Sequence, residues 1–130
     1  MKKKIESFED LDVYKLAESL GDRIWDIVSN WPDFPRNTLG YQLLKSADSI
    51  AANIAEGFGR FHFAENRQFV RISRGSLYET HHWLRRAYKR NLLKEDEIKE
   101  LRNLLDELAP RLNAYIKSIG RPLQKMTDSE

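Results

Sequence analysis

Apolar residues recur three and four positions apart along four stretches of the chain, which is the spacing of one buried face of an α-helix. The first stretch runs from about Leu11 to Asn30. Acidic residues at its start suit the positive end of the helix dipole. Pro32 and Pro35 follow, and each proline restricts the residue before it and lacks an amide donor. The sequence therefore predicts a helix and then a short non-helical loop.

The second stretch is expected to begin after Asn37 or Thr38, either of which is a candidate N-cap, and to end near Gly57 and Gly59. The third is the longest and covers about residues 64–91. Its helical pattern is uninterrupted by proline, so one long helix is predicted there.

The fourth stretch begins at the acidic run Glu95–Glu97 and ends before Gly120 and Pro122, the usual order of helix start and stop residues. Four helices joined by short connections favour antiparallel neighbours. We therefore expect an all-α fold, an antiparallel up-down four-helix bundle. The bundle domain is predicted over residues 1–123 and a disordered tail over residues 124–130.

Composition narrows the class of protein. A chain of 130 residues fits one domain. The absence of cysteine excludes thiolate metal ligands and thiol nucleophiles. Glu6, Glu9 and Asp10 follow the N-terminal lysines before any apolar run, unlike a signal peptide. No stretch approaches the roughly 20 apolar residues that span a bilayer. We expect a cytoplasmic protein that has no membrane partner.

Charge is unevenly distributed although the net charge is only +2. Residues 60–94 hold nine Lys and Arg against two Glu, whereas the remainder of the chain carries an excess of acids. At 100° per residue, one side of the third predicted helix forms a basic stripe. Its members are Arg67, Arg71, Arg74, Tyr78, His81, His82, Arg85 and Lys89. The opposite side, predicted to face the core, contains Phe69, Ile72, Ser76, Thr80, Trp83 and Ala87.

This basic stripe has two interpretations. Arginine forks match phosphate oxygens in pairs and Tyr78 could stack on a base, so the stripe suits RNA or DNA. Alternatively, it is a solvated helix face whose arginines pair with carboxylates of this subunit or a neighbouring one. The predicted nucleic-acid-binding residues are Arg67, Arg71, Arg74, Tyr78, His82, Arg85 and Lys89.

A polar row on the second predicted helix borders its apolar face and is interleaved with alanines. Small residues allow close approach of a neighbouring helix, and a mid-helix glycine in the third helix costs about 1 kcal/mol unless something compensates. We expect a tight contact, within the bundle or between subunits, at Gln42, Ser49, Asn53, Glu56 and Gly75.

No catalytic site is predicted. Glu79 and His82 have the Glu-x-x-His spacing of di-iron bundles, but such a site requires two such motifs and two further glutamates. The chain offers one motif, and its His82 lies on the basic stripe. The serines have no histidine base on the core side, and no phosphate-cradling glycine loop is present. We therefore predict no enzyme activity, metal or cofactor.

Three segments carry a resemblance to a known family. They are Phe8–Ala17, Gln42–Gly57 and Phe69–Thr80, with Ser49-Ile50 and Asn53-Ile54-Ala55-Glu56-Gly57 in register. In these segments the chain resembles the 23S rRNA intervening sequence family, also called S23 ribosomal proteins. The resemblance implies an up-down four-helix bundle that assembles into a cyclic homo-pentamer. A related accessory factor of diversity-generating retroelements contacts nucleic acid and acts with a reverse transcriptase.

The resulting hypothesis is a non-catalytic oligomeric scaffold that binds nucleic acid through the basic stripe, with a reverse transcriptase as one conceivable protein partner. The alternative is a protein–protein interaction module without nucleic-acid binding.

Overall fold

The computed structural model describes residues 4–121, and the predicted tail at residues 124–130 lies outside them. The described part is all helical, with no strand. Four long helices make up the fold: α1 (Asp12–Ser29), α3 (Tyr41–Phe58), α4 (Phe63–Lys89) and α5 (Glu95–Ser118). They lie close to the predicted ranges, and α5 continues through Pro110. A 3-10 turn, η1 (Phe8–Asp10), precedes α1.

The segment between α1 and α3 differs from the predicted loop. It contains a helical turn, α2 (Asp33–Pro35), followed by a π-type turn, η2 (Arg36–Gly40). Pro35 is tolerated because the first turn of a helix has backbone N–H groups with no intrahelical acceptor. Thr38 does not cap α3, since its hydroxyl donates to the carbonyl of Phe34 at 2.7 Å. Asn37 forms no cap bond either.

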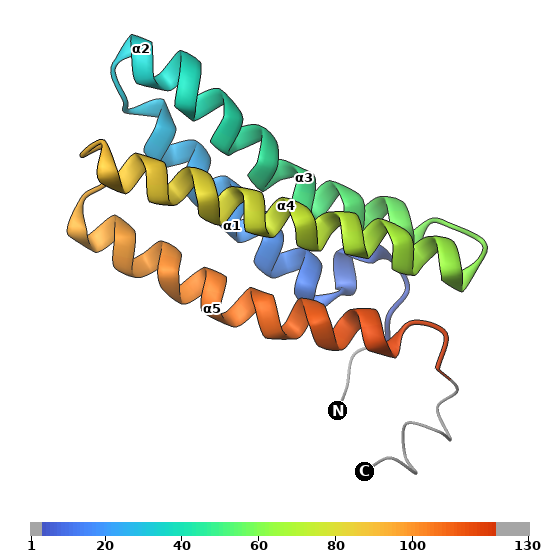
Figure 1. Cartoon of the computed structure of the whole chain (residues 1–130). Helices are drawn as coiled ribbons and strands as arrows, with labels where there is room; N and C mark the ends of the chain where they lie inside the picture. Colours follow the sequence, from blue (N-terminus) through green and yellow to red (C-terminus); the bar gives the residue numbers. More distant parts are fainter. Residues whose placement is uncertain (1–3, 122–130) are drawn as a thin grey trace.

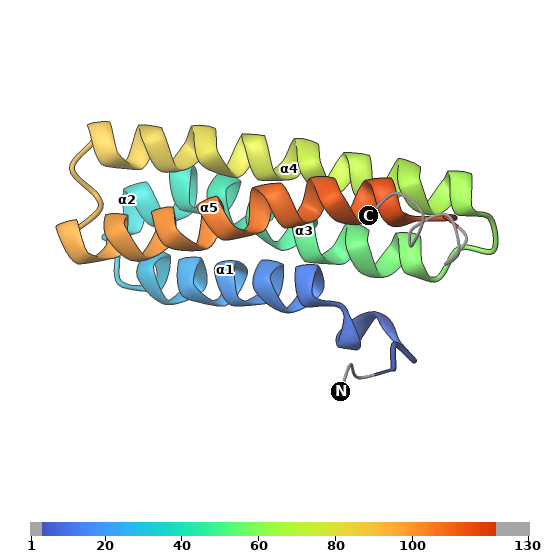
Figure 2. The ribbon, with the colours of Figure 1, turned by 90° about the horizontal axis from the view of Figure 1, so that it is seen from below.

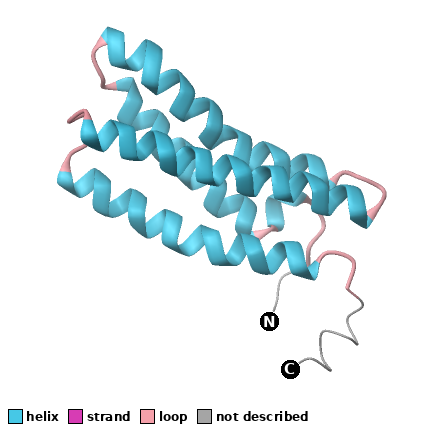
Figure 3. Ribbon diagram, viewed as in Figure 1, coloured by secondary structure: helices cyan, strands magenta, loops and turns pink. Residues whose placement is uncertain are grey.

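The long helices run alternately up and down, as Figure 1 shows, and Figure 2 gives the same bundle from below. Each contacts two neighbours in the cyclic order α1, α3, α4, α5, and α4 packs most extensively on α3. Figure 3 shows that only short loops connect them. The antiparallel four-helix bundle predicted from the sequence is therefore confirmed.

The core is aliphatic and is supplied by all four long helices. Its fully buried side chains include Leu20, Ile24, Leu43, Ile50, Ile54, Leu108 and Leu112. Burying such a side chain stabilises the fold by roughly 1.5–3 kcal/mol. No helix within residues 4–121 is long and apolar enough to cross a membrane.

The buried face of α4 overlaps the face predicted from the sequence but is rotated from it, and Phe69, Ser76 and Trp83 are half-buried. Thr80 and Ala87 are buried as expected, but Ile72 is 47% exposed. The other buried residues of α4 are Val70, Ser73, Leu77 and Leu84. The prediction placed the core opposite the arginines, whereas the true core face lies to one side of them. Two neighbours, α3 and α5, cover a wider arc of α4 than a single opposed partner would.

Candidate nucleic-acid interface

Two of the predicted arginines contact α5, because the core face of α4 is rotated toward the basic stripe. Arg67 Nη1 donates to the carbonyl of Ile119 at 3.0 Å, near the C-terminal end of α5. Arg74 Nη1 donates to Asn113 Oδ1 at 3.2 Å. Both side chains are half-buried. They hold α4 against α5, and neither is paired with a carboxylate in residues 4–121.

The remaining stripe residues are exposed. Arg71, His82, Arg85 and Lys89 point outward, and Tyr78 is 66% exposed. Within residues 4–121, no carboxylate lies within ion-pair distance of Arg71, Arg85 or Lys89. The structure therefore brings together an open cationic surface that contains the exposed ring of Tyr78. We refer to Arg71, Tyr78, His82, Arg85 and Lys89 as the open stripe.

Several other arginines are paired with carboxylates. Arg60 pairs with Glu56 at 2.7 Å, Arg111 pairs with Glu107 at 3.2 Å, and Arg23 of α1 pairs with Glu100 of α5 at 2.6 Å. Such surface pairs contribute little to stability. They do neutralise these three cations locally, whereas exposed Arg90 and Arg102 are, like the cations of the open stripe, without an ion-pair partner in residues 4–121.

Part of the polar row on α3 forms a hydrogen-bonded contact with α4. Asn53 Nδ2 donates to the carbonyl and the hydroxyl of Ser49 at 2.8 and 2.9 Å. The Ser76 hydroxyl donates to Ser49 Oγ at 3.0 Å. The chain continues inward, where buried Thr80 Oγ1 lies 3.0 Å from Ser46 Oγ. Sequence reasoning missed Ser46.

Ser73 was also missed as a contact residue. It is fully buried on α4, and its hydroxyl donates to the carbonyl of Ile50 at 2.7 Å. The signal in the sequence was the spacing of Ser73, Ser76 and Thr80, which puts three small hydroxyl side chains on one side of the helix. Such side chains allow a close helix contact and can form hydrogen bonds within it.

Gln42, Glu56 and Gly75 do not join this contact. Gln42 and Glu56 are exposed, and Glu56 accepts from Arg60 instead. Gly75 is exposed, and a Cβ placed on it would meet nothing within 4 Å. The predicted close approach at Gly75 is therefore wrong within the subunit. It occurs at Gly57, where a Cβ would lie 2.9 Å from the carbonyl of Asn66.

The side chains of Glu79 and His82 both contact Trp83. Glu79 Oε2 accepts from Trp83 Nε1 at 3.0 Å, and the ring of exposed His82 packs edge-on against Trp83 at 4.7 Å. Among residues 4–121, no group of three or more His, Cys, Asp or Glu side chains is placed to hold a metal ion.

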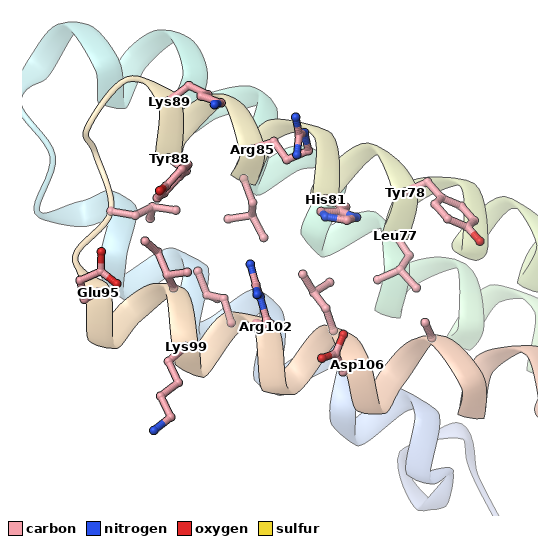
Figure 4. A pocket seen from close by; sticks show the side chains of 16 residues that line it. Leu77, Tyr78, His81, Arg85, Tyr88, Lys89, Glu95, Lys99, Arg102 and Asp106 are labelled. Carbon is pink, nitrogen blue, oxygen red and sulfur yellow. The ribbon is translucent and has the colours of Figure 1, made fainter.

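A groove of about 900 Å³ runs between α4 and α5 beside the open stripe. Figure 4 shows aliphatic side chains from both helices along it and polar side chains at its edges. Tyr78, Arg85 and Lys89 of the open stripe line the groove, as does His81, which sequence reasoning placed on the stripe but not among the binding residues. Arg71 and His82 lie outside the groove.

The groups with shifted pKa values lie in other parts of the bundle, and Asp48 and Tyr115 are two of them. Burial, and then the nearby charge of Asp22, raise the pKa of the Asp48 carboxyl on α3. Burial raises the pKa of Tyr115 on α5. Neither residue belongs to the open stripe.

The fold and this surface define an all-α four-helix-bundle protein with an unpaired cationic face. The model of the family described as 23S rRNA-intervening sequence protein matches residues 9–114. The chain therefore belongs to the 23S rRNA-intervening sequence protein family, also known as the S23 ribosomal protein family.

A solved structure has the same fold. It is a protein of unknown function from the S23 ribosomal protein family of Bacteroides thetaiotaomicron, with a TM-score of 0.71 and 22% sequence identity. The match covers 82% of this chain and 99% of that one. No curated protein matches the chain.

Proposed function

We propose that this protein is a cytoplasmic, non-catalytic oligomeric scaffold that binds RNA or DNA through the open stripe of α4. The observation that carries the proposal is the set of three exposed cations, Arg71, Arg85 and Lys89, without a carboxylate partner in residues 4–121. An uncompensated row of cations attracts a polyanion by releasing its condensed counterions.

The geometry of the open stripe supports a phosphate backbone as its ligand. The open stripe runs along one helix from Arg71 to Lys89, which are 18 residues apart, or about 27 Å at 1.5 Å per residue. Two of the three cations are arginines, whose planar guanidinium groups bind phosphate oxygens in pairs. Tyr78 provides a ring on which a base can stack.

Self-assembly is the second part of the proposal. The family resemblance supports a cyclic homo-pentamer. Exposed aromatic side chains at one end of the bundle, Trp25 at 60% and Phe34 at 79%, favour a covering partner. A protein such as a reverse transcriptase is a further candidate partner on the same family grounds. Mass determination in solution tests the assembly, and a monomer at all concentrations would contradict it.

The binding claim is tested by electrophoretic shift with single-stranded RNA and duplex DNA at two salt concentrations. The double variant Arg71→Glu, Arg85→Glu should bind at least tenfold more weakly than the wild type at low salt. A matched control, Lys15→Glu with Lys117→Glu, makes the same charge change at exposed positions on α1 and α5. Equal losses in the two double variants would show that only net charge matters and would contradict a specific stripe.

A further inference from the structure

The floor of the groove between α4 and α5 is aliphatic. Leu77 and Leu84 come from α4, Leu93 from the turn, and Ile98 and Leu105 from α5. Leu93, Ile98 and Leu105 keep part of their surface accessible, although Leu93 and Leu105 also pack on the core. The lining residues of α5 extend from Glu95 to Ala109, a length of about 21 Å at 1.5 Å per residue. The groove is therefore as long as about four helical turns.

Charged side chains line the same groove. Four are cationic and two are acidic: Arg85, Lys89, Lys99 and Arg102 against Glu95 and Asp106. In Figure 4, Arg102 points from α5 toward α4, whereas Lys99 points away. No carboxylate in residues 4–121 pairs with Arg85, Lys89 or Arg102. The groove thus combines an apolar floor with an excess of positive charge.

We infer that this groove is a docking site for an acidic amphipathic helix of another protein. Apolar anchors at positions i, i+3, i+4 and i+7 of such a helix match an aliphatic floor of this length. Its flanking carboxylates face the unpaired cations. The floor itself favours such a helix over a nucleic acid, because leucine and isoleucine side chains offer neither a stacking ring nor a phosphate ligand. Tyr78, Arg85 and Lys89, which also line the groove, are shared with the open stripe. The inference goes beyond the proposed function and does not depend on it.

The probe is a fluorescein-labelled 16-residue peptide. Leucine occupies its positions i, i+3, i+4 and i+7, continued at the same spacing along the peptide, and glutamate and alanine occupy the others. A second peptide replaces every glutamate by lysine. Fluorescence anisotropy with the full chain should show binding of the acidic peptide at least tenfold tighter than of the basic one, about 1.4 kcal/mol. Equal affinities, or no binding of the acidic peptide, would overturn the inference.

Variants locate the binding. Arg102→Glu should lower the affinity for the acidic peptide at least tenfold. Ile98→Ala should lower that affinity at least threefold, because it removes part of the apolar floor. Lys117→Glu, on α5 outside the groove, is the matched control and should leave affinity within twofold. Unchanged affinity in both groove variants, or an equal loss in the control, would refute the site.

Two further outcomes separate this docking site from other occupants. If Arg102→Glu converts an oligomeric wild type to monomers, the groove holds a second copy of the chain and the inference is wrong. If Ile98→Ala lowers the affinity for single-stranded RNA and leaves the affinity for the peptide unchanged, the ligand of the groove is a nucleic acid and the inference is wrong. Arg71→Glu should lower the affinity for nucleic acid and leave the affinity for the peptide unchanged, since Arg71 does not line the groove. Failure of the docking site and failure of the open stripe are therefore distinguishable.

Discussion

The orientation of α4 decides which of its residues are available for binding, and truncation of one buried and one exposed residue tests it. Leu77→Ala and Ile72→Ala each remove three carbon atoms from the same helix. Leu77 is 5% exposed and Ile72 is 47% exposed. In the structure Leu77 contributes to the core, whereas the spacing analysis placed Ile72 there.

The expected costs follow from burial. Three buried carbons at about 0.8 kcal/mol each, plus a cavity term, give about 3 kcal/mol for Leu77→Ala. Half-exposed Ile72 should cost about 1 kcal/mol or less, since no cavity forms and alanine favours the helix. Unfolding entropy of about 2.1 cal/mol/K per residue converts these values to losses in Tm of about 11 °C for Leu77→Ala and about 4 °C or less for Ile72→Ala.

Thermal unfolding followed by circular dichroism at 222 nm measures both variants. Each should be examined at two protein concentrations, because a contribution of Ile72 to self-association would then appear as a concentration dependence. The orientation of α4 would be refuted if Ile72→Ala lowered Tm as much as Leu77→Ala or more, and did so equally at both protein concentrations.

Other predictions follow from particular contacts. Gly57→Ala should destabilise the fold by roughly 1–3 kcal/mol, because its Cβ would press on the backbone of α4, whereas Gly75→Ala should stabilise it by up to about 1 kcal/mol, since its Cβ meets open space. Thr80→Val should cost about 1–2 kcal/mol in urea denaturation by removing the buried hydroxyl that bonds to α3. Asp48→Asn should raise Tm at neutral pH. The raised pKa of Asp48 means that folding penalises its charged form, so the gain should vanish below about pH 3.9, where the carboxyl is protonated in both states. A gain that persists at low pH would contradict that cause.

The fold was predictable because each long helix carries an apolar face at helical spacing, although the predicted caps of α3, Asn37 and Thr38, do not cap it. The helical turns between α1 and α3 were not predictable in the same way, because the two prolines indicated a break in the helix. Pro35 in fact lies in the first turn of a helix, where the missing N–H costs nothing. Here position within the turn outweighs residue type.

The candidate site was predictable in part. Arginine spacing placed the basic stripe on one side of α4, and Arg71, Arg85 and Lys89 are indeed exposed. The contacts of Arg67 and Arg74 with the α5 side of the bundle could not be predicted from the spacing of apolar residues. That spacing shows which side of a helix is apolar, but it does not show how many neighbouring helices cover that side. The α4–α5 groove was likewise invisible, since it depends on how far apart two helices lie.

The central claim is that the open stripe of α4 binds a polyanion, and the salt dependence of affinity for single-stranded RNA tests it most directly. Three neutralised phosphates predict a fall of log K with log salt of slope about −2, and Arg71→Glu with Arg85→Glu should make that slope less steep by about 1.4. A flat slope for the wild type, or an unchanged slope in the double variant, would contradict the claim.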